Sequence, residues 1–326
     1  MCAEKAATRV GVIGTGVMGG HHVRLLSGLP DARLVGIHDS DPQVARSVAE
    51  RYECRAFDNV ESLMREIDAA VIAAPTAAHA EIGEQLLAAG IDVLVEKPLA
   101  GSLVEADRLI AAAHGRVLAV GHVEYHNPAV EKILSLGLPP GFVEVHRLGV
   151  FSPRSLDIDV ALDLMIHDLQ ILHSLDPSPV LTLHAVGINV LTPRVDIANV
   201  RLELASGCVA NLTASRVSAE KVRKFRVFVP QGYYAVDYAT QEVRGYRLEA
   251  SKAGREIVKA DLEIEHREPL QRELEGFLAA SRGESDARIV TGEAGRRALE
   301  TALRVVDDMA TRRGAAGSWS QATVER

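Results

Sequence analysis

Short apolar runs alternate with longer amphipathic segments from Thr8 to about Pro128. The apolar runs, which predict strands, are residues 9–13, 32–37, 69–73, 92–96 and 117–121. The clearest amphipathic segments, which predict helices, are residues 42–52, 79–89 and 103–114. Strands that alternate with helices in this way are typical of a parallel sheet covered by helices. The first part of the chain is therefore expected to be a doubly wound α/β domain.

After Pro128 the pattern changes to one apolar helix at residues 160–175 and a series of strands. Examples of the strands are residues 197–204, 208–216, 224–229, 233–238 and 242–248. Short turns between them predict one large, mainly antiparallel open sheet. We expect the first two of these strands to present an apolar face that favours association between copies of the chain. Helices are expected again at residues 269–281 and 292–311, followed by a mobile tail at residues 312–326.

Composition and charge exclude several classes of protein. The 326 residues carry 36 Lys and Arg against 44 Asp and Glu, a net charge of −8 that argues against binding to a nucleic-acid backbone. The three cysteines have no CxxC spacing, which fits a reducing compartment. No stretch has the pattern of a signal peptide or of a membrane span. We expect a cytoplasmic protein with neither a nucleic-acid nor a membrane partner.

A glycine-rich turn directly follows the first predicted strand and begins a helix. Its residues are Gly14, Thr15, Gly16, Val17, Met18 and Gly19, a GxGxxG string. The first glycine suits a tight turn, the second lets the backbone approach a pyrophosphate, and the third lets the helix pack closely on the sheet. Amides at the N-terminus of such a helix face phosphate oxygens. The order of strand, glycines and helix predicts a dinucleotide-binding turn rather than a plain connection.

An acidic residue follows the second predicted strand. Asp39 comes 25 residues after Gly14, near the place where dinucleotide-binding domains have a carboxylate for the adenosine ribose hydroxyls. Such a carboxylate repels a 2'-phosphate, and Ser40, Asp41 and Pro42 offer no positive charge to bind one. The sequence therefore favours NAD over NADP. The alternative role of Asp39 is to cap the next helix.

Three more candidate segments follow predicted strands, at the edge where parallel sheets bind their ligands. They begin at Pro75 and Thr76, at Glu96 and Lys97, and at His122. A lysine beside a nicotinamide can polarise a carbonyl or, when burial lowers its pKa, transfer a proton. The simpler alternative for Lys97 is a surface lysine at the end of a strand.

The predicted helix at residues 160–175 carries charged residues among many apolar ones. Asp163 and His167 are four residues apart, so their side chains share one face of the helix. A histidine oriented by a carboxylate can exchange a proton with a substrate hydroxyl. The alternative is a buried histidine whose hydrogen bonds are satisfied within the protein.

Together these segments resemble the Gfo/Idh/MocA oxidoreductases. The resemblance rests on the glycine turn, on residues 75–79 (PTAAH), on residues 96–98 (EKP) and on residues 163–168 (DLMIHD), and it covers nearly the whole chain. It implies an N-terminal NAD-binding Rossmann domain, expected at residues 1–124. It also implies a substrate-binding and oligomerisation α+β domain with an open sheet, expected at residues 125–326.

The same resemblance implies roles for individual residues. Lys97 would be the catalytic lysine, with Asp163 and His167 near the substrate and Lys97 or His167 taking the hydroxyl proton. Hydride would pass between a nicotinamide and the carbon of a secondary alcohol in a sugar or cyclitol. Beyond the glycine turn and Asp39, the expected cofactor contacts are Pro75, Thr76, His79, Glu96, Lys97, His122 and Asn127.

Residues 121–128 (GHVEYHNP) resemble the dehydrogenases of UDP-sugars, notably the UDP-N-acetylglucosamine 3-dehydrogenase type. That resemblance implies further substrate contacts at Glu124 and Arg154, the latter suited to an anionic or polar group. Tyr125 and His126 stand where that branch typically has Arg and Phe.

Two other features depart from a simple pattern. Thr76 stands where the family often has Asn, although its hydroxyl can still hydrogen-bond a cofactor.

The spacing of His122, Glu124 and His126 is not that of an HExxH zinc site, and we assign no metal ligands. The adjacent His21 and His22 are expected to be exposed to solvent, with contact to the cofactor as the alternative.

The sequence therefore predicts an NAD-dependent oxidoreductase acting on a secondary hydroxyl of a sugar, in particular of a nucleotide sugar. The alternatives within the same fold are another sugar or cyclitol dehydrogenase, an NAD-dependent glycosidase and a non-catalytic NAD-sensing regulator. The joint presence of Lys97, Asp163 and His167 argues against a regulator. The resemblance also implies a homodimer or homotetramer.

Overall fold

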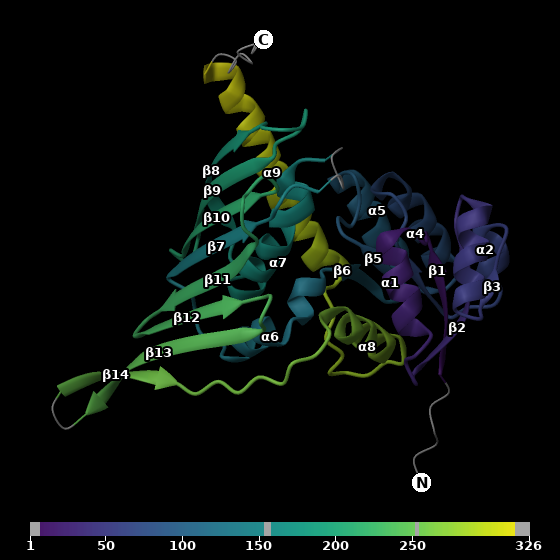
Figure 1. Ribbon diagram of the computed structural model, residues 1–326, viewed down its shortest axis with the longest axis horizontal. Helices are drawn as coiled ribbons and strands as arrows, with labels where there is room; N and C mark the ends of the chain where they lie inside the picture. The colour runs from purple at the N-terminus through teal and green to yellow at the C-terminus, as the bar shows by residue number, and fades with distance from the viewer. Residues whose placement is uncertain (1–6, 153–157, 252–253, 317–326) are drawn as a thin grey trace. The chain divides into compact units, whose positions relative to one another are not determined.

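The computed structural model describes residues 7–152, 158–251 and 254–316 (Figure 1). They form two compact units. The first unit contains the chain up to Glu131 and the segment Glu265–Leu299, and the second contains Lys132–Ile264 and the chain from Glu300 onward. This division differs from the expected single boundary after residue 124, because a late segment of the chain belongs to the first unit.

A six-stranded sheet in which every pair is parallel forms the centre of the first unit. The strands lie in the order β3-β2-β1-β4-β5-β6, with bounds β1 Thr8–Ile13, β2 Ala32–His38, β3 Arg55–Ala56, β4 Ala69–Ile72, β5 Asp92–Glu96 and β6 Leu118–Gly121. All residues of β4 and β5 are buried, as expected where helices cover both faces of a parallel sheet. The expected doubly wound fold is confirmed.

The helices of the first unit connect these strands. Their bounds are α1 Val17–Leu26, α2 Pro42–Arg51, α3 Val60–Met64, η1 Thr76–Ala78, α4 His79–Ala88, α5 Leu103–Ala113 and η2 Val123–His126. Helix α6 (Pro128–Ser135) then leads into the second unit.

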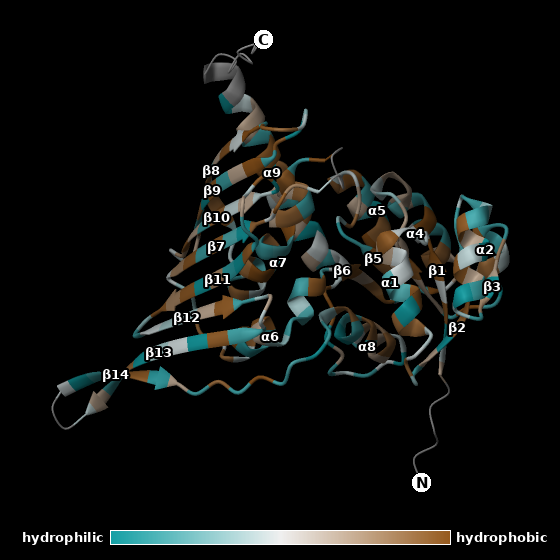
Figure 2. Cartoon of the chain, in the orientation of Figure 1, coloured by the Kyte–Doolittle hydropathy of each residue, from teal (hydrophilic) through white to brown (hydrophobic). Residues whose placement is uncertain are grey.

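Helix α8 (Pro269–Ser281) completes the core of the first unit. Its apolar stripe is Leu270, Leu274, Phe277 and Leu278, which are buried in the same cluster as the central strand β1. The spacing of these four residues is that of one helix face, and the apolar residues of α8 are visible in Figure 2. Residues 265–299 therefore belong to the first unit because their apolar side chains are part of its core.

The second unit is built on an eight-stranded sheet in the order β14-β13-β12-β11-β7-β10-β9-β8. The bounds are β7 Phe142–Leu148, β8 Val180–Ile188, β9 Ile197–Leu204, β10 Val209–Ser215, β11 Val222–Val229, β12 Gly232–Asp237, β13 Glu242–Ser251 and β14 Gly254–Ala260. All pairs are antiparallel except β7 with β10. The expected large, mainly antiparallel sheet is confirmed.

Two helical segments of this unit pack on one face of the sheet. A π-helical turn, η3 (Ala161–Met165), continues directly into α7 (Ile166–Leu175), and β10 contacts η3. The later part of α9 (Gly292–Ala316) lies beside β8, where the Ala185 amide donates a hydrogen bond of 2.7 Å to Asp308. Helix α9 extends to Ala316, so the expected tail is wrong for residues 312–316; residues 317–326 lie outside the described chain.

The free face of β9 and β10 is polar. In β9 the apolar residues Ala198, Val200 and Leu202 are buried, whereas Asn199 and Arg201 alternate with them and are exposed. The expectation of an apolar free face on these strands was therefore wrong, because alternation directs their apolar residues to the covered face.

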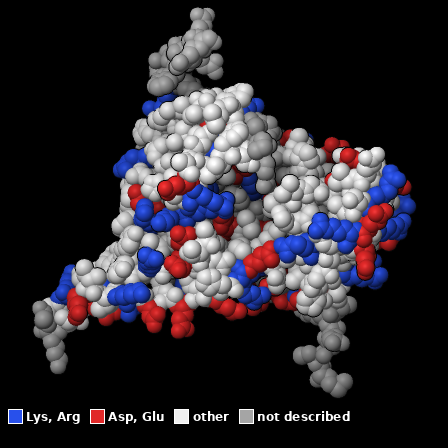
Figure 3. Space-filling view, in the orientation of Figure 1, with Lys and Arg blue, Asp and Glu red and all other residues white. Residues whose placement is uncertain are grey.

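Charged side chains of both signs are interspersed on the face seen in Figure 3. No helix within the described parts of the chain has the length and hydrophobicity needed to cross a membrane.

Candidate active site

The glycine turn joins β1 to α1 with a geometry that requires two of its three glycines. Gly14 has φ +83°, and a side chain there would meet the backbone of Ala73 and Ala74 at 2.6–2.7 Å. A Cβ on Gly19 would lie only 1.9 Å from the Gly14 carbonyl oxygen. The helix therefore packs against the turn as closely as a dinucleotide fingerprint demands.

Gly16 leaves open space at the N-terminus of α1. It is exposed, and a Cβ on it would have no atom within 4 Å. It precedes Val17 as the N-cap residue, and no side chain caps the helix or places an acid in its first turn. Amides without a capping side chain, at the positive end of a helix dipole, fit the pyrophosphate of NAD. Val17 is exposed and Met18 is half-buried at the same place.

Asp39 follows β2 and is bonded to the glycine turn. One of its carboxylate oxygens accepts hydrogen bonds from the Thr15 amide at 2.7 Å and the Thr15 hydroxyl at 2.9 Å. The other accepts one from the Asp41 amide at 2.9 Å. Partial burial opposes ionisation, but these hydrogen bonds from Asp41 and Thr15 outweigh it and lower the pKa of Asp39. Asp39 is therefore a carboxylate at neutral pH, while Asp41 is the residue that caps α2.

The segment after β4 contains one exposed and one buried candidate. Pro75 is exposed and Thr76, which begins η1, is half-buried. His79 is buried, with Nδ1 2.9 Å from the Pro98 carbonyl oxygen and Nε2 2.9 Å from the Ala74 carbonyl oxygen. His79 thus joins the loops after β4 and β5, which is a structural role.

The end of β5 brings together a lysine, an acid and a histidine. Lys97 is half-buried, and its amide donates a hydrogen bond of 3.2 Å to Glu96. The other carboxylate oxygen of Glu96 lies 2.7 Å from Nε2 of His22 on α1. His22 is fully buried, so its expected exposure was wrong, whereas the neighbouring His21 is exposed. His22 lies on the buried face of α1, together with Gly19, Val23 and Leu26.

Most polar residues after β6 are buried, namely His122, Glu124, His126 and Asn127. Burial, reinforced by the positive charge of Lys97, lowers the pKa of His122 to about 3 and keeps its ring neutral. Glu124 is buried, and Asn127 Nδ2 lies 3.5 Å from one of its oxygens. Asn127 Oδ1 also accepts a hydrogen bond from the Ala129 amide, which places Asn127 at the start of α6.

Asp163 and His167 lie in the second unit. Asp163 is half-buried in the π-helical turn η3, and His167 is buried in the first turn of α7. π-Helical turns are rare and are frequent at functional sites. Arg154, the remaining substrate candidate, lies outside the described residues.

A buried group of residues fixes the helix that bears His167. The neighbouring Asp168 accepts two hydrogen bonds from Arg147 of β7, at 2.6 and 2.8 Å, and one from the Tyr238 hydroxyl at 2.9 Å. The Arg147 guanidinium also lies over the Tyr238 ring, 4.8 Å from its centroid. Arg147 and Tyr238 were not predicted from the sequence, because no local pattern marks a charged residue whose partner lies far away in the chain.

A hollow of about 450 Å³ lies away from these residues. It is lined by Thr8, Asp92 and Arg116, among others, and thus lies at the amino ends of the strands β1 and β5. Ligands of open parallel sheets bind at the opposite, carboxyl ends, so this hollow is not the cofactor site.

The glycine turn, the uncapped helix, Asp39 and the parallel sheet define an NAD-binding domain of the dehydrogenase type. Residues 8–122 match the sequence model of the Gfo/Idh/MocA oxidoreductase family, described as having an NAD-binding Rossmann fold. A UDP-N-acetylglucosamine 3-dehydrogenase of Acidithiobacillus ferrooxidans is 37% identical over 302 residues, which cover 91% of this chain and 96% of that protein. The chain belongs to the Gfo/Idh/MocA family and is an NAD-binding oxidoreductase.

Solved structures agree with this assignment. A structure of the Acidithiobacillus ferrooxidans UDP-N-acetylglucosamine 3-dehydrogenase has a TM-score of 0.87 and 35% identity, covering 94% of this chain and 98% of that one. A second similar structure is that of GenD2 from gentamicin A biosynthesis, solved with NAD, with a TM-score of 0.80 and 21% identity over 95% of this chain and 96% of that one. At that identity the second likeness concerns the fold alone.

Proposed function

We propose that this chain oxidises the 3-hydroxyl of UDP-N-acetylglucosamine or of a closely related nucleotide sugar. The observation that carries the proposal is the 37% identity to a UDP-N-acetylglucosamine 3-dehydrogenase across 91% of the chain. The inositol 2-dehydrogenase of Rubrobacter xylanophilus is 35% identical but matches only 52% of the chain. The similarity to the nucleotide-sugar enzyme extends over both units, including the segment that bears Asp163 and His167.

In this proposal the chain's own residues bind the reactants and move one proton. NAD would supply the hydride acceptor for oxidation of the carbinol carbon. Gly14, Gly16 and Asp39 would hold its phosphates and adenosine ribose. Lys97 or His167 takes the hydroxyl proton as the carbonyl forms, and Asp163 orients the sugar. Pro75, Thr76, His122 and Asn127 are proposed cofactor contacts, and Glu124 and Arg154 are proposed substrate contacts.

A substrate panel tests the proposal. The purified chain is incubated with NAD and either UDP-N-acetylglucosamine, UDP-glucose, myo-inositol or glucose 6-phosphate, and NADH is followed by its absorbance. We expect NADH from UDP-N-acetylglucosamine and a product lighter by two hydrogen atoms in mass spectrometry. Faster NADH formation from myo-inositol or glucose 6-phosphate would contradict the nucleotide-sugar proposal. The chain would then be a dehydrogenase of a cyclitol or of a sugar phosphate.

The two rival functions predict different results in the same assay. An NAD-dependent glycosidase would hydrolyse a glycoside without net NADH, because the transiently oxidised sugar is reduced again. A non-catalytic regulator would bind NAD in calorimetry and turn over none of the sugars. Either result would contradict the proposed dehydrogenase.

We also propose that the protein is a homodimer or homotetramer, as the family resemblance implies, and that it is cytoplasmic, as its cysteine usage suggests. Light scattering at several concentrations measures its mass, and a monomer at all of them would contradict this proposal.

A further inference from the structure

Three side chains that can bind a metal ion meet in the core of the first unit. His22 comes from α1, Glu96 from the end of β5, and Glu273 from α8. Their exposed fractions are 0%, 8% and 2%. One ligand atom from each lies within 4.8 Å of the others, and no other such group occurs within the described ranges.

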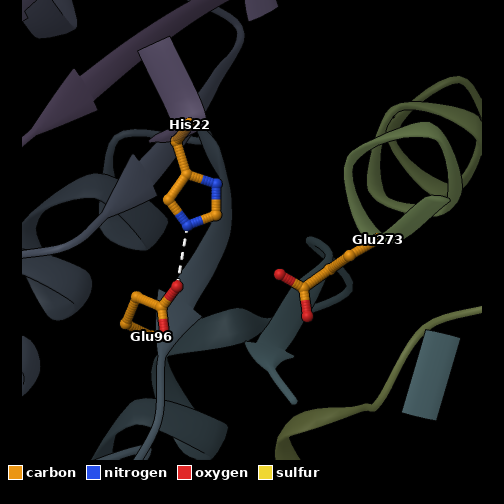
Figure 4. Close-up of side chains that lie close together, drawn as sticks. All are labelled: His22, Glu96 and Glu273. Atoms are coloured by element: carbon orange, nitrogen blue, oxygen red, sulfur yellow. Dashed lines mark hydrogen bonds and ion pairs between the residues drawn. The ribbon is translucent and has the colours of Figure 1, made fainter. Parts of the chain in front are cut away.

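Glu273 points into this cluster without a hydrogen-bond partner. Neither of its carboxylate oxygens has a hydrogen bond with any described residue, and both are shielded from solvent. Figure 4 shows its carboxylate directed across a gap toward the pair formed by His22 Nε2 and Glu96, which are 2.7 Å apart. Buried carboxylates are normally paired or hydrogen-bonded, so this arrangement calls for a partner.

Burying the carboxylates of Glu96 and Glu273 close together is electrostatically unfavourable. Burial, together with the nearby Glu96 carboxylate, opposes ionisation of Glu273 and raises its pKa well above the usual value. With both carboxylates ionised, the cluster would hold two buried negative charges beside the imidazole of His22. One proton would remove only one of these charges, whereas a divalent cation would balance both and bind the imidazole nitrogen as well.

The donor set matches one class of ion. An imidazole nitrogen and two carboxylate oxygens are ligands of Zn²⁺, with bonds of about 2.0–2.2 Å. In tetrahedral coordination such bonds place ligand atoms about 3.4 Å apart. That separation lies between the 2.7 Å of the His22–Glu96 pair and the 4.8 Å limit of the cluster, so small side-chain rotations would close the site.

We propose that His22, Glu96 and Glu273 bind one divalent transition-metal ion, for which Zn²⁺ is the probe. The ion joins α1 and β5 to α8, the helix that returns to the first unit from late in the chain. Its role is structural: it holds residues 265–299 on the parallel sheet and fixes Glu96, whose other oxygen binds the Lys97 amide. The inference does not depend on which sugar is the substrate.

Metal content and calorimetry test the site in the full chain. The protein is stripped with a chelator, dialysed, and titrated with Zn²⁺, and the retained metal is measured by elemental analysis. The test variant is Glu273→Gln, and the matched control is Glu275→Gln on the same helix, whose carboxylate forms a partly exposed pair with Arg267. We expect one tightly held ion per chain in the wild type and in the control, and binding at least about 100-fold weaker in Glu273→Gln.

Two further readouts keep the test decisive if Glu273→Gln folds poorly. Zn²⁺ should raise the melting temperature of the wild type and of Glu275→Gln, because a ligand that binds only the folded state stabilises it. Co²⁺ added to the stripped wild type should give the visible absorption of a cobalt ion bound by nitrogen and oxygen. Equal zinc content in the wild type and Glu273→Gln, or no ion and no cobalt spectrum in the wild type, would overturn the proposal and leave a proton as the partner of Glu273.

Discussion

Arg147 donates two hydrogen bonds to Asp168, and both side chains are buried in the second unit. The pair joins the central strand β7 to α7, directly after His167. Removing one partner of a buried ion pair leaves the other charge uncompensated. The pair therefore fixes the position of the helix that bears His167, one of the two proposed proton acceptors.

Loss of the Arg147 guanidinium should destabilise the fold strongly. We expect Arg147→Met to lower the free energy of unfolding by about 3–5 kcal/mol, since the Asp168 charge stays buried. The control is Arg226→Met on the same sheet, because the Arg226–Glu144 pair is partly exposed and should contribute less than about 1 kcal/mol. Urea denaturation followed by circular dichroism measures both. Equal losses in the two variants would contradict this account of the buried pair.

Substitutions of two glycines in the turn should have different effects, one on folding and one on cofactor binding. Gly19→Ala should destabilise the protein, because its Cβ would clash with the Gly14 carbonyl oxygen. Gly16→Ala should leave the melting temperature unchanged but weaken NAD, because its Cβ would enter the open space at the start of α1. Gly20→Ala, also without neighbours within 4 Å, is the control for NAD binding, which it should leave unchanged, while alanine in place of this helical glycine should stabilise the protein by up to about 1 kcal/mol. Unimpaired NAD binding by Gly16→Ala in calorimetry would remove that glycine from the pyrophosphate site.

Asp39 should determine the choice of cofactor. We expect Asp39→Ala to weaken NAD and to relax discrimination against NADP, because the carboxylate that repels a 2'-phosphate is gone. Asp41→Ala is the control, since Asp41 caps α2 and should affect only stability. Dissociation constants for both cofactors, measured by quenching of protein fluorescence, give the ratio. If the ratio is the same in both variants, Asp39 does not contact the ribose.

Lys97 should matter for turnover rather than for NAD affinity. Lys97→Ala is expected to lower kcat by about 10²–10⁴-fold, the usual contribution of a positioned proton-transfer group. Lys221→Ala, an exposed lysine of the second unit, is the control and should keep full activity. Steady-state kinetics with the best sugar of the panel, together with NAD calorimetry, separates the two effects. Wild-type kcat in Lys97→Ala would exclude the lysine from the reaction.

Acid should destabilise the first unit through His126. Burial, with the charges of Arg288 and Arg272, lowers the pKa of His126 to about 3, below the 6.5 of an unfolded histidine. Between these values the unfolded chain binds the extra proton, so stability is full above pH 6.5 and falls on acidification. The expected loss is about 1.4 kcal/mol for each pH unit below 6.5.

A variant isolates this effect from other titrating groups. His126→Leu, which has no proton to bind, should show a shallower loss of stability between pH 6.5 and 4 than the wild type. Urea denaturation over this range measures the slope. Parallel slopes for the two proteins would assign the acid sensitivity to other residues.

Local patterns were sufficient to predict the parallel strands and the glycine turn. The apolar runs that became β1, β4 and β5 are short and bounded, and Gly14 and Gly19 serve a turn whose geometry depends on neighbouring residues. The roles of Lys97, Asp163 and His167 stay predictions, since they came from family resemblance and are for the kinetic experiments to decide.

Relationships between distant segments could not be predicted in the same way. The burial of His22 depends on how α1 packs on the parallel sheet, and the assignment of residues 265–299 to the first unit depends on α8 joining the core cluster of β1. One local signal was available: Glu273 is an acid between Leu270 and Leu274 on the apolar stripe of a predicted helix. An acid in that position indicates a buried partner, but the partners lie about 180 and 250 positions earlier in the chain.

The return of α8 to the first sheet constrains the order of events during synthesis. When only the first 131 residues have left the ribosome, the nascent chain exposes the apolar surface that Leu274 and Phe277 later cover. The nascent Rossmann half must therefore wait for nearly all of the intervening sheet to emerge, and a fragment cut at residue 131 would be an aggregation-prone protein rather than a minimal NAD-binding module.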